Sequence, residues 1–194
     1  IQPSTETSPE AAARQRVLLL MILLNAFATP LMLSSANVAL PSIARDLSLD
    51  AVILAWVPMV YLMASTIFVL IFGRVADTAG RKRIFLIGTA AVIVSSVYAA
   101  LSVNSTMLLS ARFAQGVSAA MLYATQMALV TSAFPAKVRG KMIGLVVGCI
   151  YVGLSAGPLL GGYVIDVLGW RAAFLLQVPL ALVVLLLGIF RVEG

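Results

Sequence analysis

Residues 17–44 read VLLLMILLNAFATPLMLSSANVALPSIA and contain no charged side chain. The run exceeds the approximately 20 residues that a helix needs to cross the hydrocarbon core of a bilayer. No water is available in that core, so the segment must be helical in order to satisfy its own backbone polar groups. This stretch therefore predicts a membrane-spanning helix.

The rest of the chain is similar in composition. Of the 194 residues, 62% are hydrophobic and 10% are charged, and the mean hydropathy is +1.09. A water-soluble core cannot bury so much apolar surface, which places the chain among integral membrane proteins. We expect an all-α bundle of six transmembrane helices. The predicted spans are approximately 17–43, 51–73, 84–103, 106–134, 141–165 and 171–190.

Basic residues are distributed unevenly between the two sides that these spans define. If the N-terminus is cytoplasmic, ten Lys and Arg residues lie in inner segments and only Arg45 and Arg171 lie in outer loops. This bias predicts a multi-pass protein of the cell (inner) membrane with a cytoplasmic N-terminus. We expect residues 1–16 to form a cytoplasmic tail, disordered over residues 1–13, and residues 17–194 to form the bundle.

Two similar motifs divide the bundle into halves. Residues 73–80 (GRVADTAG) and residues 162–169 (GYVIDVLG) share the spacing Gly-x3-Asp-x2-Gly and lie 89 residues apart. The interval covers three spans, so the second copy is upside down in the membrane, as in the inverted repeats of secondary transporters. Chance is the alternative, because glycine and aspartate are common in turns.

The first motif continues into a basic segment that ends at Arg83. Here glycines allow a tight turn, and Asp77 is expected to cap a helix start and to pair with Arg81. The charges serve either as a topological anchor or as a latch that holds neighbouring helices together in one conformation. The candidate gating residues are Gly73, Asp77, Gly80, Arg81, Lys82 and Arg83.

Arg112 lies within the fourth predicted span. A charge inside a membrane is costly enough to indicate function, although an arginine can also extend its side chain to the outer headgroups. Gln115, Gly116, Tyr123 and Gln126 follow at helical spacing and share a polar-lined face. We therefore expect Arg112, Gln115 and Gly116 to belong to a functional site.

Glycines recur along the fifth span. They let a neighbouring helix approach closely, and a proline favours a bend, so plain helix packing accounts for part of the pattern. Packing alone would require only one or two such glycines. The residues of this motif are Gly144, Gly153, Gly157, Pro158, Gly161 and Gly162.

These motifs resemble signatures of the N-terminal six-helix half of the major facilitator superfamily. Residues 73–83 resemble its loop between helices two and three, except that Thr78 replaces a common arginine. Residues 112–116 resemble its fourth-helix motif, and the fifth-span glycines resemble the antiporter signature of its drug exporters. Residues 37–41 (NVALP) resemble the first-helix signature of its fourteen-span drug:proton antiporter (multidrug efflux) family.

The resemblance implies proton-coupled efflux of drugs or other small amphipathic compounds by alternating access. It implies that Arg112 and Gln115 face a central cavity and help to couple proton movement. No Asp or Glu lies well inside a predicted span, so the proton-carrying carboxylate is not identified. The proton gradient would supply the energy, with no cofactor.

The expected partners are a small-molecule substrate, protons, the lipid bilayer and a second bundle, with no nucleic acid. The chain starts with Ile1 and stops after the sixth span, which suggests a fragment that lacks a C-terminal half of about six to eight helices. The alternative is a half-size protein that pairs with a second copy. Candidate substrate contacts, each of which could also serve helix packing, are Asn25, Thr29, Asn37, Tyr61, Tyr123 and Gln126.

Other classes of function are less compatible with the residues. Residues 153–157 (GLSAG) fit the Gly-x-Ser-x-Gly motif of serine hydrolases, but the chain has no histidine, and no lysine within a span, to activate Ser155. We therefore expect no enzyme, and no cluster of metal ligands is apparent. A passive or inactive membrane scaffold, or a major facilitator transporter of another small solute, stays open.

Overall fold

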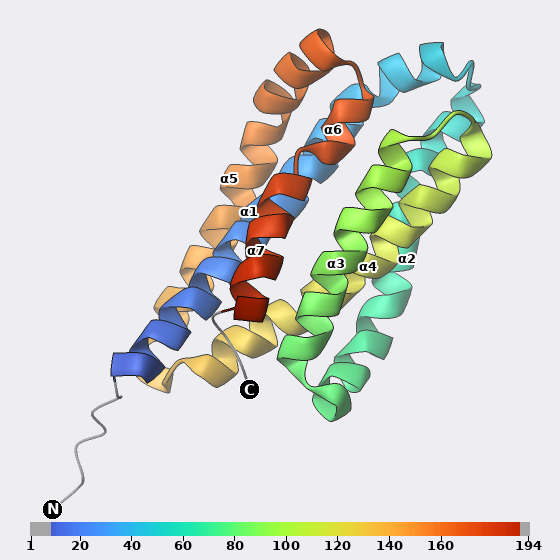
Figure 1. The fold of residues 1–194 in the computed structure, drawn as a ribbon. Coiled ribbons are helices and arrows are strands. Elements are labelled where there is room, and N and C mark those ends of the chain that lie inside the picture. Colours follow the sequence, from blue (N-terminus) through green and yellow to red (C-terminus); the bar gives the residue numbers. More distant parts are fainter. Residues whose placement is uncertain (1–8, 191–194) are drawn as a thin grey trace, which may run out of the picture.

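The computed structural model describes residues 9–190, and every regular element in this range is a helix. The helices run along the long direction of an elongated bundle (Figure 1). The predicted all-α membrane bundle is confirmed. The helices are α1 (Pro9–Asp46), α2 (Ala51–Ala79), α3 (Arg81–Ala100), α4 (Ser105–Ala133), α5 (Ala136–Leu168), α6 (Arg171–Leu175) and α7 (Val178–Phe190).

Two helix pairs form the frame of the bundle. α1 packs along α5, α2 packs along α4, α3 lies against α4, and α7 contacts both α1 and α3. In the predicted repeat, α1, α2 and α3 correspond to α4, α5 and the α6–α7 segment. The α1–α5 pair is then the counterpart of the α4–α2 pair, so the observed packing follows the repeat.

Gly80 and Gly169 occupy equivalent positions in the two repeats. Each directly follows a helix, has a positive φ (97° and 83°), and donates its N–H to a carbonyl four residues earlier. These bonds join Gly80 to Ala76 at 3.0 Å and Gly169 to Ile165 at 2.9 Å. Only glycine adopts such φ values without strain. The two turns lie at opposite ends of the bundle, as an inverted repeat requires (Figure 1).

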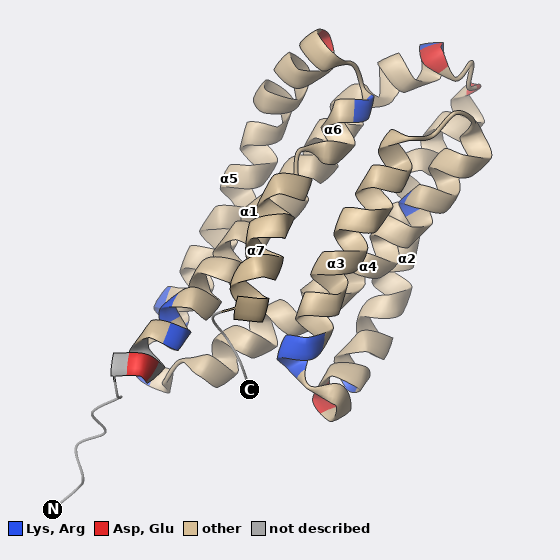
Figure 2. Ribbon diagram, in the orientation of Figure 1, with Lys and Arg blue, Asp and Glu red and all other residues tan. Residues whose placement is uncertain are grey.

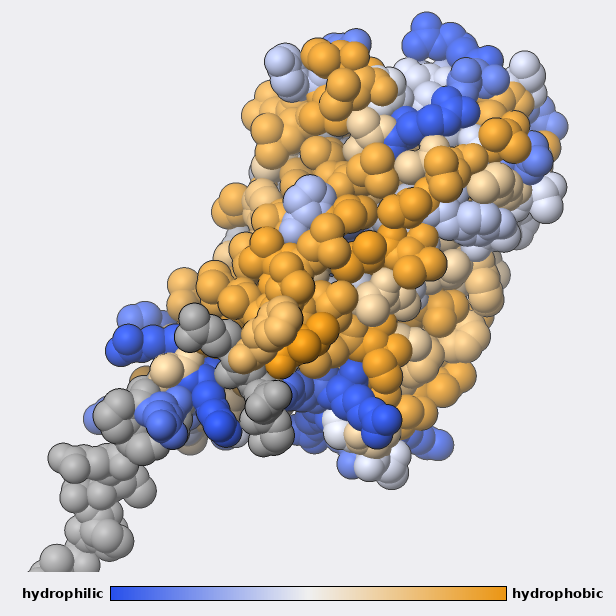
Figure 3. All heavy atoms as spheres, viewed as in Figure 1, coloured by the Kyte–Doolittle hydropathy of each residue, from blue (hydrophilic) through white to orange (hydrophobic). Residues whose placement is uncertain are grey.

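The surface of the bundle suits a bilayer. Large apolar side chains point outward, including Leu70, Leu159 and Tyr163, which are more than two-thirds exposed. Figure 3 shows that hydrophobic residues form a broad band and that hydrophilic residues lie towards the two ends. Lys and Arg gather at the end where α1 begins and where α2 meets α3 (Figure 2). Exposing such a band is unfavourable in water but favourable in hydrocarbon.

Within the described range, five helical segments are long and apolar enough to cross a membrane. They are Ala13–Asp46, Ala51–Ala79, Arg81–Ala100, Ala136–Leu168 and Arg171–Phe190.

α4 is not among these five segments, although its 29 residues span about 43 Å at 1.5 Å per residue. It is more polar because it carries Arg112, Gln115 and Gln126, all of which are buried. These polar groups contact protein rather than lipid. α4 is therefore the polar centre of the bundle.

Several helices extend further than hydropathy predicts. α1 begins at Pro9, so the disorder predicted for residues 9–13 is wrong, whereas residues 1–8 lie outside the described part of the chain. α2 continues to Ala79, and Gly80 alone separates it from α3. Hydropathy marks where a helix leaves hydrocarbon, whereas the backbone hydrogen bonds continue into water.

The sixth predicted span is divided into two helices. α6 ends at Leu175 and α7 begins at Val178. Pro179 has no N–H to donate to the carbonyl of Leu175, which interrupts the helix there. In the interruption, the Gln177 side chain turns inward and donates from Nε2 to Ser96 Oγ at 2.7 Å.

Candidate functional site

Arg112 is buried inside the bundle, with 1% of its surface exposed. Its Nε donates to the backbone oxygen of Val57 at 3.1 Å, and its Nη1 donates to Gln115 Oε1 at 2.9 Å. The guanidinium carbon lies 4.5 Å from the centre of the Tyr61 ring. The side chain does not extend to the membrane surface, so the headgroup-anchor interpretation is wrong for this structure.

A chain of polar side chains continues from Arg112 through the protein. Gln115 Nε2 donates to Ser96 Oγ at 3.1 Å, and Gln177 reaches the same oxygen. This network joins α4 to α3 and to the segment between α6 and α7. Sequence reasoning missed Ser96 and Gln177, although both are polar residues within otherwise apolar spans, which is a usable signal.

Arg112 makes no ion pair among the described residues. The ion pairs in residues 9–190 are Asp77–Arg81 and Asp46–Arg171, both exposed at helix ends. The groups around the buried positive charge are a carbonyl, an amide oxygen, the Met32 sulfur and the rings of Tyr61 and Phe174. These neighbours stabilise the charge without a counter-ion from residues 9–190, which is an unfavourable environment for a buried cation.

Gly116 brings α2 and α4 together beside Arg112. A Cβ at this position would lie 2.5 Å from the Tyr61 backbone oxygen and 2.7 Å from Ala64 Cβ, which leaves no room for a side chain. The close approach places the Tyr61 ring over the guanidinium. Gly116 is thus a packing residue that shapes the arginine site.

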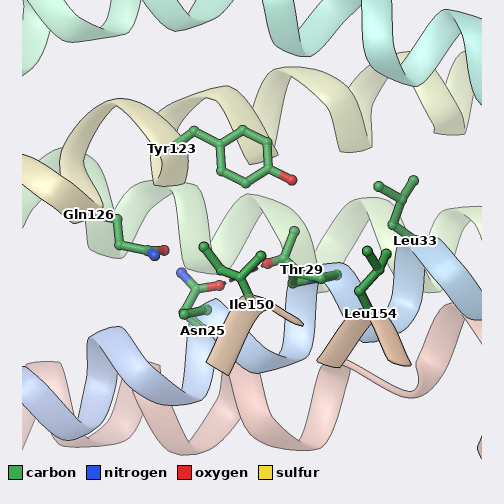
Figure 4. A pocket seen from close by; sticks show the side chains of 9 residues that line it. Asn25, Thr29, Leu33, Tyr123, Gln126, Ile150 and Leu154 are labelled. Carbon is green, nitrogen blue, oxygen red and sulfur yellow. Dashed lines mark hydrogen bonds between the residues drawn. The ribbon is translucent and has the colours of Figure 1, made fainter. Parts of the chain in front are cut away.

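A pocket of about 280 Å³ lies between α1, α4 and α5 (Figure 4). Its walls combine a few polar side chains with apolar ones, as ligand pockets commonly do. The lining residues are Asn25, Ala26, Thr29, Pro30, Leu33, Tyr123, Gln126, Ile150 and Leu154.

Asn25 is the most unusual residue of the pocket. It is 7% exposed, and its Oδ1 accepts a hydrogen bond from Thr29 Oγ1 at 2.9 Å. Its Nδ2 has no hydrogen-bond partner among residues 9–190. Figure 4 shows the Asn25 amide pointing from α1 towards the side of the pocket that Gln126 and Tyr123 of α4 form.

Two tyrosines connect the pocket to the arginine site. The hydroxyls of Tyr123, in the pocket wall, and Tyr61, over the guanidinium, are 3.1 Å apart and share a hydrogen bond. A change in the pocket that moved Tyr123 would therefore act on the surroundings of Arg112 through one contact.

The structure divides the predicted site residues. Asn25, Thr29, Tyr123 and Gln126 line the pocket, whereas Tyr61 lies behind Tyr123. Asn37 is exposed and lies outside the pocket. Arg112 and Gln115 do not face this cavity either, because α2 and α3 enclose them. Their predicted cavity-facing positions are wrong for the arrangement seen here.

The fifth-span glycines also fall into two groups. Gly153, Gly157 and Gly161 are buried against α1, and a Cβ on any of them would overlap α1. In contrast, a Cβ at Gly144 or Gly162 would meet no described atom within 4 Å. Pro158 is exposed. One face of α5 therefore makes the close packing, and the remaining motif residues point away from it.

The predicted gating segment forms a helix end rather than a loop. Asp77 lies in the last turns of α2 instead of capping a helix start, and the N-cap of α3 is Gly80. The predicted pair does form, with Asp77 Oδ1 2.9 Å from Arg81 Nη2. Arg81 Nη1 also donates to the Ala128 carbonyl at 3.4 Å, which ties the start of α3 to α4.

The family model of the Major Facilitator Superfamily matches residues 22–193 of this chain. The chain belongs to the major facilitator superfamily. This membership confirms the resemblance that the motifs indicated. It also assigns the chain to a family of membrane transporters, so the serine hydrolase interpretation of Ser155 is set aside.

The chain is also similar to three named proteins. It is 32% identical over 173 residues to the riboflavin transporter RibZ of Clostridioides difficile, covering 89% of this chain and 38% of that protein. It is 37% identical over 158 residues to the multidrug resistance protein Stp of Mycobacterium tuberculosis, covering 81% and 29%. It is 30% identical over 153 residues to the probable actinorhodin transporter of Streptomyces coelicolor, covering 77% and 26%. The chain thus spans roughly a third of the length of these relatives.

Proposed function

We propose that this chain is the N-terminal half of a secondary transporter that exports drugs or other small amphipathic compounds in exchange for protons. The observation that carries the proposal is the pocket between α1, α4 and α5, together with its link through Tyr123 and Tyr61 to the buried Arg112. A substrate site and a buried charge are thereby connected by direct contacts. The names of the multidrug resistance and actinorhodin-transporting relatives support transport of small molecules.

A second bundle would complete the transport pathway. In the most apolar stretch of each helix, only 22% of the α2 residues and 17% of the α5 residues are buried, compared with 50% in α1 and in α3. α2 and α5 are also counterparts in the inverted repeat. In this proposal their free faces meet a C-terminal half or a second copy, and rocking of the two bundles gives alternating access to the pocket.

Charged contacts at the two ends would hold the alternating states. At one end Arg81 binds Asp77 and the Ala128 carbonyl. At the other end Arg171 binds Asp46 and donates to the Ser102 carbonyl at 3.1 Å. The end of the bundle that is rich in Lys and Arg, which includes the start of α1, would lie on the cytoplasmic side of the inner membrane.

Arg112 would take part in proton coupling without carrying the proton itself. Its site holds a positive charge and lacks a carboxylate among residues 9–190. In this proposal the proton-carrying carboxylate comes from outside these residues, and the enclosed positive charge of Arg112 favours its ionised form through the low-dielectric interior, without direct contact. The proton gradient is the energy source, and no cofactor is required.

Dye export by cells tests this proposal. Cells that produce the longest gene product containing this chain would be loaded with an uncharged dye (Nile red) or a cationic dye (ethidium). We expect export of at least one dye and its arrest by a protonophore. Arg112→Ala should abolish the proton-driven part while the membrane level is retained, and Arg112→Lys should retain some of it. Arg14→Ala, at the exposed start of α1, is the matched control.

The outcomes separate the alternatives. Export by the 194-residue chain alone would identify a transporter of two copies rather than a half that needs another segment. Undiminished export by Arg112→Ala would contradict the coupling role. If neither dye is exported by any of these proteins, a passive scaffold or a transporter of an unrelated solute becomes the better hypothesis.

A further inference from the structure

The pocket between α1, α4 and α5 is uncharged. None of the nine described residues that line it carries a charge. The carboxylates of residues 9–190 are all exposed near helix ends, and the cation Arg112 lies behind Tyr61, which bonds Tyr123 of the pocket wall. A bound cation would therefore find no counter-ion among residues 9–190 and would share their interior with a positive charge, which is unfavourable.

The pocket does offer a hydrogen-bond donor. The Thr29 hydroxyl donates to Asn25 Oδ1, which sets the orientation of the amide. Asn25 Nδ2 is left without an acceptor among residues 9–190. A buried N–H without an acceptor is costly, so a ligand that supplies an acceptor gains more there than it would in water. The donor selects for an acceptor group such as a carbonyl.

The remaining walls favour a flat apolar body next to that acceptor. The Tyr123 ring forms one side in Figure 4, and Ile150 and Leu154 of α5 form another. Aromatic rings stack well on a tyrosine face, and aliphatic side chains exclude water around them. These three features occur in one cavity of about 280 Å³.

We infer that this pocket binds uncharged aromatic compounds that carry a carbonyl or similar acceptor, with the acceptor on Asn25 Nδ2, in preference to organic cations. The inference rests on the proposed function, because it assumes that this pocket holds the substrate. It deepens that function by naming the class of compound.

A matched pair of ligands tests the inference directly. N-methylacridone and N-methylacridinium share a three-ring skeleton, but the first is uncharged with a carbonyl and the second is a cation without one. Binding of each to the purified full-length protein would be measured by fluorescence titration. We expect the acridone to bind about tenfold more tightly, the effect of one well-formed hydrogen bond. Tighter binding of the acridinium would overturn the inference.

One substitution locates the effect at Asn25. Asn25→Leu keeps the branched shape of the side chain and removes the donor, so acridone affinity should fall about tenfold while acridinium affinity changes little. Asn37→Leu makes the same change on an exposed position of the same helix and should alter neither affinity. Equal losses of affinity for both ligands in Asn25→Leu would contradict a specific hydrogen bond. The comparison of the two ligands on the wild-type protein does not depend on how the variant folds.

Binding and export together distinguish the two proposals. Protonophore-sensitive dye export without any preference for the acridone would refute the substrate class and leave the proposed function standing. A preference for the acridone in the absence of export would support the pocket chemistry and refute the proposed transport activity.

Discussion

Gly161→Ala tests whether the fifth-span glycines act through contact with α1. A Cβ at Gly161 would lie 2.5 Å from Ser35 Cβ and 2.8 Å from Ser35 Cα. Ordinary contact begins near 3.4 Å, so the Ser35 Cα at 2.8 Å would have to move by about 0.6 Å. A backbone atom cannot rotate away, and α1 must therefore shift relative to α5.

The expected cost follows from two contributions. Overpacking of a close contact destabilises by about 1–3 kcal/mol. The shift would also strain the hydrogen bond in which the single Ser35 hydroxyl proton is shared between the carbonyls of Leu31 at 2.7 Å and Gly157 at 3.1 Å. Alanine gains up to about 1 kcal/mol over glycine in a helix interior, which offsets part of this cost. We expect a net destabilisation of about 1–2 kcal/mol.

Gly162→Ala is the matched control, because it makes the same change one residue later where no described atom lies within 4 Å. Thermal unfolding of the two full-length variants in detergent would be followed by loss of the monodisperse peak in size-exclusion chromatography. We expect a lower midpoint temperature for Gly161→Ala alone. Equal midpoints for the two variants would refute the close packing of α5 on α1.

Two further substitutions test other contacts. Tyr61→Phe removes the hydroxyl that bonds Tyr123 but keeps the ring over Arg112. We therefore expect substrate binding to be retained and the effect of a protonophore on export to weaken. Unchanged coupling in export assays would exclude the tyrosine link. Asp77→Asn breaks an exposed ion pair with Arg81 that adds little to stability. The midpoint temperature of unfolding should therefore be unaltered while the export rate falls. A normal export rate would exclude a latch at this end.

The motif residues predicted from sequence are of two kinds. Those whose role is set by the backbone, such as Gly80 and Gly169, were predictable because a turn between two helices needs a positive φ at a fixed place. Residues whose role depends on the facing helix were not. The spacing of Gly144 and Gly161 does not reveal that only the second meets α1.

The polar interior shows the same difference. A buried charge at Arg112 was predictable, because an arginine in the middle of an apolar span is costly unless protein surrounds it. Its partners Ser96 and Gln177 come from distant spans, and one of them lies where Pro179 interrupts the last helix. Sequence spacing within a helix carries no information about which residues of other helices will meet it.

The motifs indicated a transporter through their resemblance to signatures of the major facilitator superfamily. The sequence by itself determined that the chain is a membrane-spanning helical bundle and that its two halves carry the same turn motif in inverted positions. Apolar run length, charge distribution and turn residues suffice for these conclusions, because each depends on the solvent or on local backbone geometry. Only the tertiary structure decided that Asn25 keeps a free donor in an uncharged pocket and that two tyrosines separate this pocket from Arg112. Those facts depend on which side chains from α1, α2, α4 and α5 come into contact, and packing alone settles that.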